Sequence, residues 1–285
     1  MEPSDYIQRR QQLWARRKQK SLRSRTSDDD HIRDNYVVEL GDNLFAPLMP
    51  FSRAEFEQGD GGELHADQRI SNMYAVHSSS AIFANSIEYW RQADNLSAIA
   101  KALKIPSTQI TGFRFEAKHI IDPSFERAPN IDGCFSYESS SKLKAIGIES
   151  KFSEPYSNRE VTPLNSRYIE LPQWEQLPAT LQLARKLHQG TAEFKHVGAS
   201  QLIKHILGMV TAYGCNGFRL LYLWYAVPHP VSHTHAEEID QFSECVTADG
   251  INFTALTYQD LFLRLAHHER GLHQAYVDYL IERYL

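Results

Sequence analysis

The strongest constraint on the fold is a short, nearly continuous apolar run at residues 220–227, Leu-Leu-Tyr-Leu-Trp-Tyr-Ala-Val. A run of this kind is typical of a β-strand that is buried on both faces. Such a strand lies inside a sheet, and other elements must cover both of its sides. The sequence therefore predicts an α/β protein whose sheet is flanked by helices.

Three stretches upstream of this run alternate between apolar and polar residues, at 113–118, 131–135 and 145–152. This alternation predicts strands, because successive side chains of a strand point to opposite faces. On this pattern Phe113, Phe115 and Ala117 share one face of the first strand, and Ile131, Gly133 and Phe135 share one face of the second. Three serines at 139–141 are typical of the turn of a hairpin, which joins the second of these strands to the third.

Apolar residues recur with helical spacing in much of the remaining chain. The predicted helices span residues 78–93, 96–103, 174–188, 199–213, 234–248, 257–269 and 272–284. A last strand is predicted at 252–257, and residues 40–75 are expected to form loops with short elements. This order predicts one mixed sheet covered by helices.

The composition excludes several classes of protein. The 14 Phe, 14 Tyr and 4 Trp supply enough apolar surface to exclude a disordered chain. No apolar stretch is long enough to span a bilayer, and we expect no membrane partner and no secretory signal. Phosphate-loop and dinucleotide-binding motifs are missing from the sequence, which makes nucleotide-driven work within this chain a poor hypothesis. The widely spaced Cys134, Cys215 and Cys245 indicate reduced thiols and a cytoplasmic protein.

The N-terminal stretch is strongly basic, although the formal net charge of the whole chain is −5. We interpret residues 1–35 as a basic N-terminal arm and residues 36–285 as a single domain. The arm is either a solvated or loosely docked segment or a contact for nucleic-acid phosphates, because clustered cations attract them. Its candidate phosphate-binding residues are Arg9, Arg10, Arg16, Arg17 and Lys18.

The chemistry is expected on the hairpin. Glu149 and Lys151 lie two residues apart on a predicted strand, so both project from one face. Asp132 lies on the preceding strand, and the hairpin brings it toward Glu149. A salt-bridge cluster on a solvated sheet face is the structural alternative. Two close carboxylates otherwise favour a cation between them, and an oxygen-only site suits Mg²⁺ or Mn²⁺. A neighbouring lysine can then hold an attacking water, which suits phosphodiester hydrolysis.

The motif Asn130-Ile131-Asp132 followed by Ile148-Glu149-Ser150-Lys151 resembles the signature of PD-(D/E)XK nucleases, in which an Asp and a Glu-x-Lys lie on adjacent strands. The resemblance extends to residues 59–64, 78–90 and 151–155. The resemblance covers roughly residues 57–265. Within this region the chain resembles a bacterial branch of restriction-endonuclease-like proteins. The chain departs from the signature at Ile131, where proline usually precedes the Asp, and its nearest proline is Pro129.

The resemblance implies a restriction-endonuclease-like mixed β-sheet core flanked by helices. It also implies that Asp132 and Glu149 bind the metal, with the carbonyl of Ser150 as a further ligand, and that Lys151 is the catalytic lysine. An upstream acidic residue commonly completes such sites. The preferred candidate is Glu63, in its glycine-rich setting, and the next candidates are Glu116 and Glu88.

A second group of side chains is expected beside this site. Gln201, Lys204 and His205 share the predicted helix 199–213 and are expected to face DNA or the attacking water. Glu154 is expected either to hydrogen-bond within the site or to cap the following segment. Histidines at 229, 233 and 235 resemble metal ligands by spacing, but two flanking prolines favour a surface loop.

The leading hypothesis is a Mg²⁺-dependent (or Mn²⁺-dependent) hydrolase, an endonuclease-like enzyme that cleaves DNA. One alternative is a nucleic-acid-binding or scaffold protein that has the same fold and does not cleave. Another is a nuclease that acts on RNA or works only inside a larger assembly. The apolar residues of the last two helices would also support a homodimer or a partner protein, although core packing is their more common use.

Overall fold

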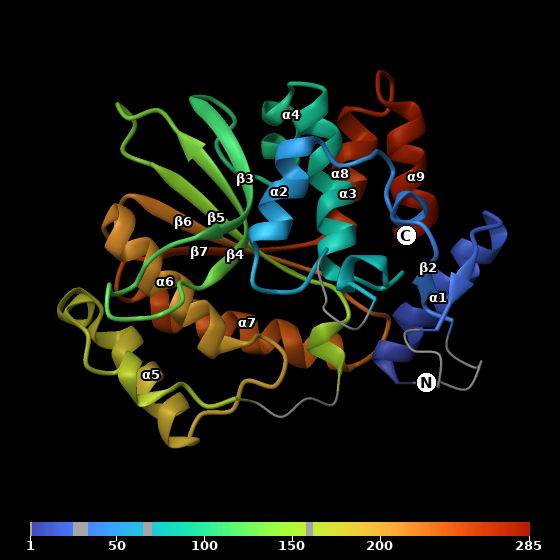
Figure 1. Cartoon of the computed structure of the whole chain (residues 1–285). Helices are drawn as coiled ribbons and strands as arrows, with labels where there is room; N and C mark the ends of the chain where they lie inside the picture. Colours follow the sequence, from blue (N-terminus) through green and yellow to red (C-terminus); the bar gives the residue numbers. More distant parts are fainter. Residues whose placement is uncertain (1, 25–33, 65–69, 158–161) are drawn as a thin grey trace.

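The computed structural model describes residues 2–24, 34–64, 70–157 and 162–285, and Figure 1 shows how its elements are arranged. The α-helices are α1 (Pro3–Arg17), α2 (Pro50–Gln58), α3 (Ser79–Gln92), α4 (Leu96–Ala102), α5 (Pro178–Gln189), α6 (Ala199–Tyr213), α7 (Val231–Thr247), α8 (Tyr258–His268) and α9 (Gln274–Tyr284). The strands are β1 (Leu22–Arg23), β2 (Tyr36–Val37), β3 (Ile110–Lys118), β4 (Asn130–Tyr137), β5 (Ala145–Lys151), β6 (Phe218–Trp224) and β7 (Asn252–Thr257). The described residues contain no helix that is both long and apolar enough to cross a membrane.

The main sheet has five strands in the order β3-β4-β5-β6-β7. The first three strands are antiparallel to one another, whereas β5, β6 and β7 run parallel. The parallel half needs crossover connections, and the helices between these strands supply them. A mixed sheet flanked by helices was predicted, and the structure confirms it.

Helices cover both faces of the sheet (Figure 1). Helices α3, α4, α8 and α9 contribute to the core on one face, and α5, α6 and α7 contribute to the core on the other. Strand β6 supplies side chains to both cores: Leu221 and Leu223 pack in the first, and Leu220 and Tyr222 in the second. The prediction of a strand buried on both faces is therefore confirmed.

Most predicted elements are present, and the differences have physical reasons. Helix α2 was missed within the expected loops because Pro50 occupies the first helical position, where its fixed φ suits a helix start. Helix α5 begins at Pro178 and not at residue 174, because a 3₁₀ turn at Pro172–Gln176 precedes it. Helix α7 already begins at Val231.

The alternation predicted for β3 and β4 breaks where the two strands carry acidic residues. Phe113 and Phe115 pack in one core, but Ala117 packs in the other, so the expectation that all three share a face is wrong. The reason is that Glu116 has φ +49°, in the left-handed region that non-glycine residues rarely adopt. A similar switch separates Ile131 from Phe135 on β4, on either side of Asp132.

Helix α1 packs against α9, so this part of the basic stretch is folded onto the rest of the chain. The contact centres on Arg283, which is 1% exposed and whose guanidinium lies 4.1 Å from the ring of Trp14. Gln11 of α1 accepts a hydrogen bond from Arg283 and donates one to its carbonyl. Residues 25–33 of the predicted arm lie outside the described residues, and the division into an arm and a single domain remains a prediction.

Candidate active site

Acidic side chains from three neighbouring strands meet at one level of the sheet. The register between β3 and β4 places Glu116 opposite Asp132. Continuing the register between β4 and β5 by one residue places Glu149 opposite Asp132 as well. The structure thus brings Asp132 and Glu149 together, as a hairpin between their strands requires.

Asp132 interacts with the backbone of β5. Its Oδ2 accepts a hydrogen bond of 2.6 Å from the N–H of Ser150. The carbonyl of Lys151 instead accepts from Tyr225, on the β6 side. Because backbone groups alternate along a strand, the carbonyl of Ser150 is directed to the same side as its N–H, toward Asp132.

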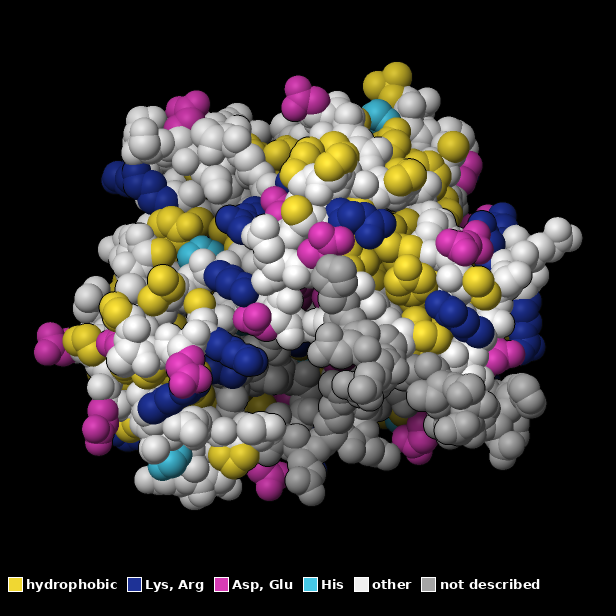
Figure 2. Space-filling model, viewed as in Figure 1, with side chains coloured by type: hydrophobic (Ala, Val, Ile, Leu, Met, Phe, Trp, Pro, Cys, Tyr) yellow, Lys and Arg dark blue, Asp and Glu magenta, His cyan; other side chains and the backbone are white. Residues whose placement is uncertain are grey.

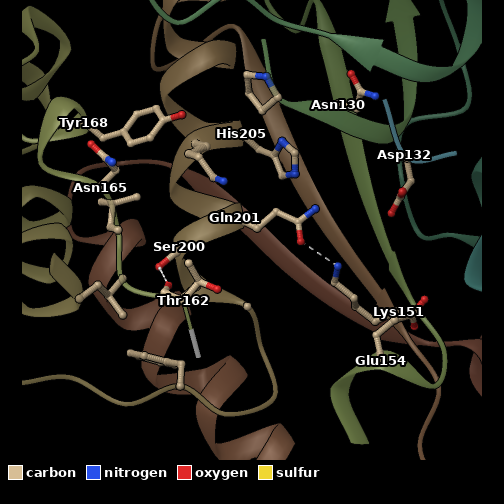
Figure 3. Close-up of a pocket in the computed structure, with 18 of the residues that line it drawn as sticks. Asn130, Asp132, Lys151, Glu154, Thr162, Asn165, Tyr168, Ser200, Gln201 and His205 are labelled. Carbon is tan, nitrogen blue, oxygen red and sulfur yellow. Dashed lines mark hydrogen bonds between the residues drawn. The ribbon is translucent and has the colours of Figure 1, made fainter. Parts of the chain in front are cut away.

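Glu149 is 1% exposed and lies between two basic side chains. Its Oε1 accepts from Nζ of Lys151 at 2.6 Å, and Nε2 of His205 lies 3.0 Å from its Oε2. Nζ of Lys151 also donates to Oε1 of Gln201 at 3.0 Å, the contact drawn in Figure 3. Gln201 and His205 are one turn apart on α6, so this helix contacts Lys151 through Gln201 and Glu149 through His205.

Burial and charge shift the pKa values of these groups in opposite directions. Burial and the neighbouring Glu149 raise the pKa of Asp132 well above its ordinary value. Burial opposes ionisation of Glu149 too, but Lys151 and His205 outweigh it and lower its pKa to about 2. Burial likewise opposes the charge of Lys151, yet Glu149 and Asp132 raise its pKa. These shifts favour a protonated Lys151 next to an ionised Glu149.

Glu63 and Glu116 form a second acidic pair beside this group. Burial is the main cause that raises the pKa of each, and Glu63 helps to raise that of Glu116 to about 8. The glycine-rich loop lies against both carboxylates: a Cβ on Gly59 would be 2.8 Å from Oε2 of Glu116, and one on Gly61 would be 2.9 Å from Oε1 of Glu63. Close backbone approach, the reason for preferring Glu63, is thus observed. Oε2 of Glu63 is buried and has no hydrogen-bond partner in the described part of the chain.

A cavity of about 830 Å³ opens onto these residues. The site candidates that line it include Glu63, Glu116, Asp132, Lys151, Gln201, Lys204 and His205. Glu149 does not line the cavity, because it is buried behind its contacts with Lys151 and His205. In Figure 3, Asp132 and Lys151 lie on one side of the cavity, opposite Asn165 and Tyr168.

The other acidic candidates differ in position. Glu154 lines the cavity and accepts a hydrogen bond from the N–H of Phe152, so it both faces the site and caps the adjoining segment. Glu88 is 3% exposed and accepts from Met49 and Ser52, away from the cavity. It therefore holds α2 against α3 and does not complete the site.

Basic side chains that the sequence interpretation missed also line the cavity. They are Arg127 and Lys195, from loops, and Arg167, from the 3₁₀ turn Ser166–Tyr168, and they join Lys204 of α6. Several Lys and Arg side chains gather beside the hollow near the middle of the face in Figure 2. The signal was weak in the sequence because these residues are isolated and far apart along the chain.

The basic candidates of α1 do not line this cavity. Arg9, Arg16 and Arg17 are exposed, Arg10 donates to the hydroxyl of Tyr6, and Lys18 forms an ion pair of 2.8 Å with Glu282. The structure therefore separates a basic helix surface from the acidic cavity.

The histidine-rich segment is not a surface loop at every position. His235 is fully buried in α7, and its Nε2 lies 3.0 Å from the hydroxyl of Tyr222. Glu238, one turn later, accepts from three successive backbone N–H groups at 195–197. Both side chains have structural partners, so the surface-loop interpretation is wrong for them.

The described residues contain no group of three or more His, Cys, Asp or Glu side chains placed so that they could hold a metal ion. The donor chemistry nevertheless suits a hard cation. Asp132 and the Ser150 carbonyl are directed to one side, and Asp132, Glu63 and Glu116 are at least partly buried carboxyls with raised pKa values. Mg²⁺ is commonly bound by one or two carboxylates plus waters, so the residues fit it.

The mixed sheet and its flanking helices are consistent with a restriction-endonuclease-like fold. The chain belongs to the family described as "Restriction Endonuclease associating with ARP", whose model matches residues 8–285. The family description indicates a nuclease-like, hydrolytic role and a protein partner, ARP. Searches of curated proteins and of solved structures gave no match.

Proposed function

We propose that this protein is a metal-dependent nuclease of the PD-(D/E)XK type that hydrolyses DNA phosphodiester bonds by attack of water. The observation that carries the proposal is the meeting of Asp132 and Lys151 in one cavity, with Glu149 buried directly against Lys151. The family supports a nuclease-like role in general terms. Metal, substrate and residue roles are our proposal.

Asp132, Glu149 and the carbonyl of Ser150 would hold Mg²⁺, or Mn²⁺ in its place. When bound, such an ion would neutralise charge on the scissile phosphate and lower the pKa of a water molecule. Glu63 and Glu116 lie beside this position, and a bound divalent cation would favour their ionised forms, which burial otherwise opposes.

Lys151 would hold the attacking water and stabilise the negative charge that develops on the phosphate. Its raised pKa keeps Nζ protonated, so it acts as a hydrogen-bond donor and not as a general base. Gln201 accepts from the same Nζ and would fix its direction.

DNA would be held by cations outside the acidic group. Lys204 lines the cavity, Arg9, Arg10, Arg16 and Arg17 belong to α1, and Lys18 is its C-cap residue. Contacts of this kind bind phosphates without reading the sequence, and they weaken as salt displaces them.

The test is incubation of the purified protein with supercoiled plasmid, single-stranded DNA and RNA in Mg²⁺, Mn²⁺ or EDTA. Wild type is compared with Lys151→Ala and Asp132→Ala, and with Lys101→Ala, an exposed position on α4 outside the cavity. We expect DNA cleavage that requires metal, is lost in the first two variants and persists in the third. Retained cleavage in both site variants, with the fold intact by circular dichroism, would refute the site assignment.

A second candidate is a nucleic-acid-binding or scaffold protein that does not cleave. One observation favours it: Glu149, a proposed metal ligand, does not line the cavity and is buried between Lys151 and His205. Salt-sensitive DNA binding without cleavage in any metal, with or without the protein partner, would support this candidate. Cleavage of RNA alone would instead identify an RNA nuclease.

A further inference from the structure

The end of the cavity that lies across from Lys151 is lined by side chains that donate hydrogen bonds or carry positive charge. They are Thr162, Asn165, Arg167, Lys195, Ser200 and Lys204. Figure 3 shows Thr162, Asn165 and Ser200 on this side. Of the cavity-lining residues that the structure describes between positions 162 and 204, none is acidic. The carboxylates of the cavity therefore belong to its other end.

Two of these cations lie against one aromatic ring. The guanidinium of Arg167 lies 4.9 Å from the ring centre of Tyr168 and 4.9 Å from that of Phe125, and it donates to the hydroxyl of Tyr168 at 2.9 Å. Nζ of Lys204 lies 5.9 Å from the same centre of Tyr168. Contact with two rings and a hydroxyl restricts the direction of the exposed guanidinium, although Arg167 itself is on the surface.

Neither of these two charges is neutralised within the part of the chain that the structure describes. No carboxylate there forms an ion pair with Arg167 or with Lys204. Two like charges against one ring repel each other, and an anion bound between them removes that repulsion. Cations of one sign that line a cavity also raise the local concentration of an anionic ligand.

We infer that Arg167 and Lys204 bind one phosphate of the nucleic-acid strand, separate from the phosphate that is cleaved. This inference rests on the proposed function and adds a second point at which the substrate is held. A planar guanidinium presents two parallel donors to a phosphate, and an ammonium group supplies a third. The side chain of Asn165 accepts from the N–H of Arg167 at 3.0 Å, which leaves its amide group able to donate beside them.

The fold holds this phosphate site at a fixed position relative to Lys151. Gln201 accepts from Nζ of Lys151 at 3.0 Å, and Lys204 lies one turn further along the same helix, α6. Ser200 of α6 donates to the carbonyl of Thr162 at 3.2 Å, which ties the segment that carries Arg167 to this helix. A strand bound at both ends of the cavity is therefore cleaved at a fixed spacing from the second phosphate.

The test uses a series of DNA duplexes, each with one phosphate of a labelled strand replaced by an uncharged methylphosphonate. The products that wild type forms in Mg²⁺ are mapped for each duplex. We expect cleavage of a bond to fall at least about tenfold when the neutral linkage lies at one fixed spacing from it, because a charge-assisted contact is lost. Cleavage that depends on no such spacing would overturn the inference.

Two variants assign that spacing to the proposed site. Arg167→Gln and Lys204→Gln should each cleave the unmodified duplex more slowly and lose the effect of the methylphosphonate at this spacing. Lys101→Gln is the matched control, because this exposed lysine of α4 is outside the cavity, and it should behave as wild type. Thermal unfolding identifies a variant that fails to fold. An effect that persists in both folded site variants would contradict the assignment.

The phosphate can be an internal diester or the terminal phosphate of a strand. Duplexes with 5′-phosphate and 5′-hydroxyl ends separate these two sources. Cleavage that is confined to one spacing from the end, and is lost with the 5′-hydroxyl, would identify a terminal phosphate. Cleavage that is the same with both ends would identify an internal diester.

A binding experiment in EDTA distinguishes failure of this inference from failure of the proposed function. We expect the variant with both Arg167→Gln and Lys204→Gln to reduce the slope of log affinity against log salt by about 0.9, the loss of one phosphate contact. Metal-dependent cleavage with an unchanged slope would leave the nuclease standing and remove the phosphate site. A reduced slope without cleavage by any form of the protein would do the reverse.

Discussion

Replacing the buried Arg283 by methionine tests what holds α1 against the rest of the chain. The guanidinium donates to Oε1 of Gln11 at 3.0 Å, to the carbonyl of Asn43 at 2.8 Å and to the hydroxyl of Tyr279 at 2.6 Å. It also donates to Oδ1 of Asn43 and lies over Trp14. No carboxylate forms an ion pair with it among the described residues.

The expected loss of stability follows from the acceptors that the variant leaves behind. The carbonyl of Asn43 keeps a bond from Asn85, but Oε1 of Gln11 and Oδ1 of Asn43 lose the donor that Arg283 provides. Each buried acceptor without a partner costs about 1–3 kcal/mol, and loss of a desolvated cation–π contact adds about 2 kcal/mol. Relief from burying a charge offsets part of this. We therefore expect unfolding free energy to fall by about 2–4 kcal/mol.

Urea denaturation measures this change as a shift in midpoint at constant slope. Arg270→Met is the control: this exposed residue pairs with Asp278 at 2.8 Å, and its loss should change stability by less than about 0.5 kcal/mol. A double-mutant cycle with Gln11→Leu should give a coupling of about 0.5–3 kcal/mol. If Arg283→Met is as stable as wild type, the free-energy cost of burying the charge equals the stabilisation from all of its contacts. That result would refute the reasoning.

Three further predictions concern other regions. Gly59→Ala places a Cβ 2.8 Å from Oε2 of Glu116 and should displace that carboxylate and lower cleavage, whereas Gly41→Ala, with no atom within 4 Å, should not; equal rates would contradict this. Burial lowers the pKa of His235 to about 3, helped by His196 and Lys151. Because the unfolded chain takes up this proton near pH 6.5, unfolding free energy should fall as pH decreases below that value, by at most about 1.4 kcal/mol per pH unit. The unfolding free energy of His235→Gln, measured by urea denaturation at a series of pH values, should fall less steeply with decreasing pH. An unchanged pH dependence would refute the assignment. If Arg16 and Arg17 contact phosphates, alanine at both should reduce the slope of log affinity against log salt by about 1.8, and an unchanged slope would exclude these contacts.

The sequence allowed prediction of the elements whose pattern is local. Strands at 113–118 and 145–152 and the helix at 199–213 follow from periodicity alone, and the hairpin then places Asp132 near Glu149. The break in alternation at Glu116 could not be predicted, because glutamate rarely adopts a left-handed backbone conformation and its presence does not indicate one.

Other features depend on contacts between distant parts of the chain. The burial of His235 requires Tyr222 on a neighbouring strand, which the two prolines before it do not indicate. The cavity is lined by residues from three strands, from α5 and α6 and from loops, so no single segment carries its pattern. Such features follow from tertiary packing and are outside the reach of local periodicity.

The docking of α1 on α9 has a consequence for folding during synthesis. Gln11 and Arg283 are 272 residues apart, so α9 is synthesised long after α1. Until α9 has emerged, Trp14 lacks the guanidinium of Arg283 that lies over its ring, and apolar surface left uncovered in a partly folded chain favours premature association. Closure of this contact is therefore a late step of folding.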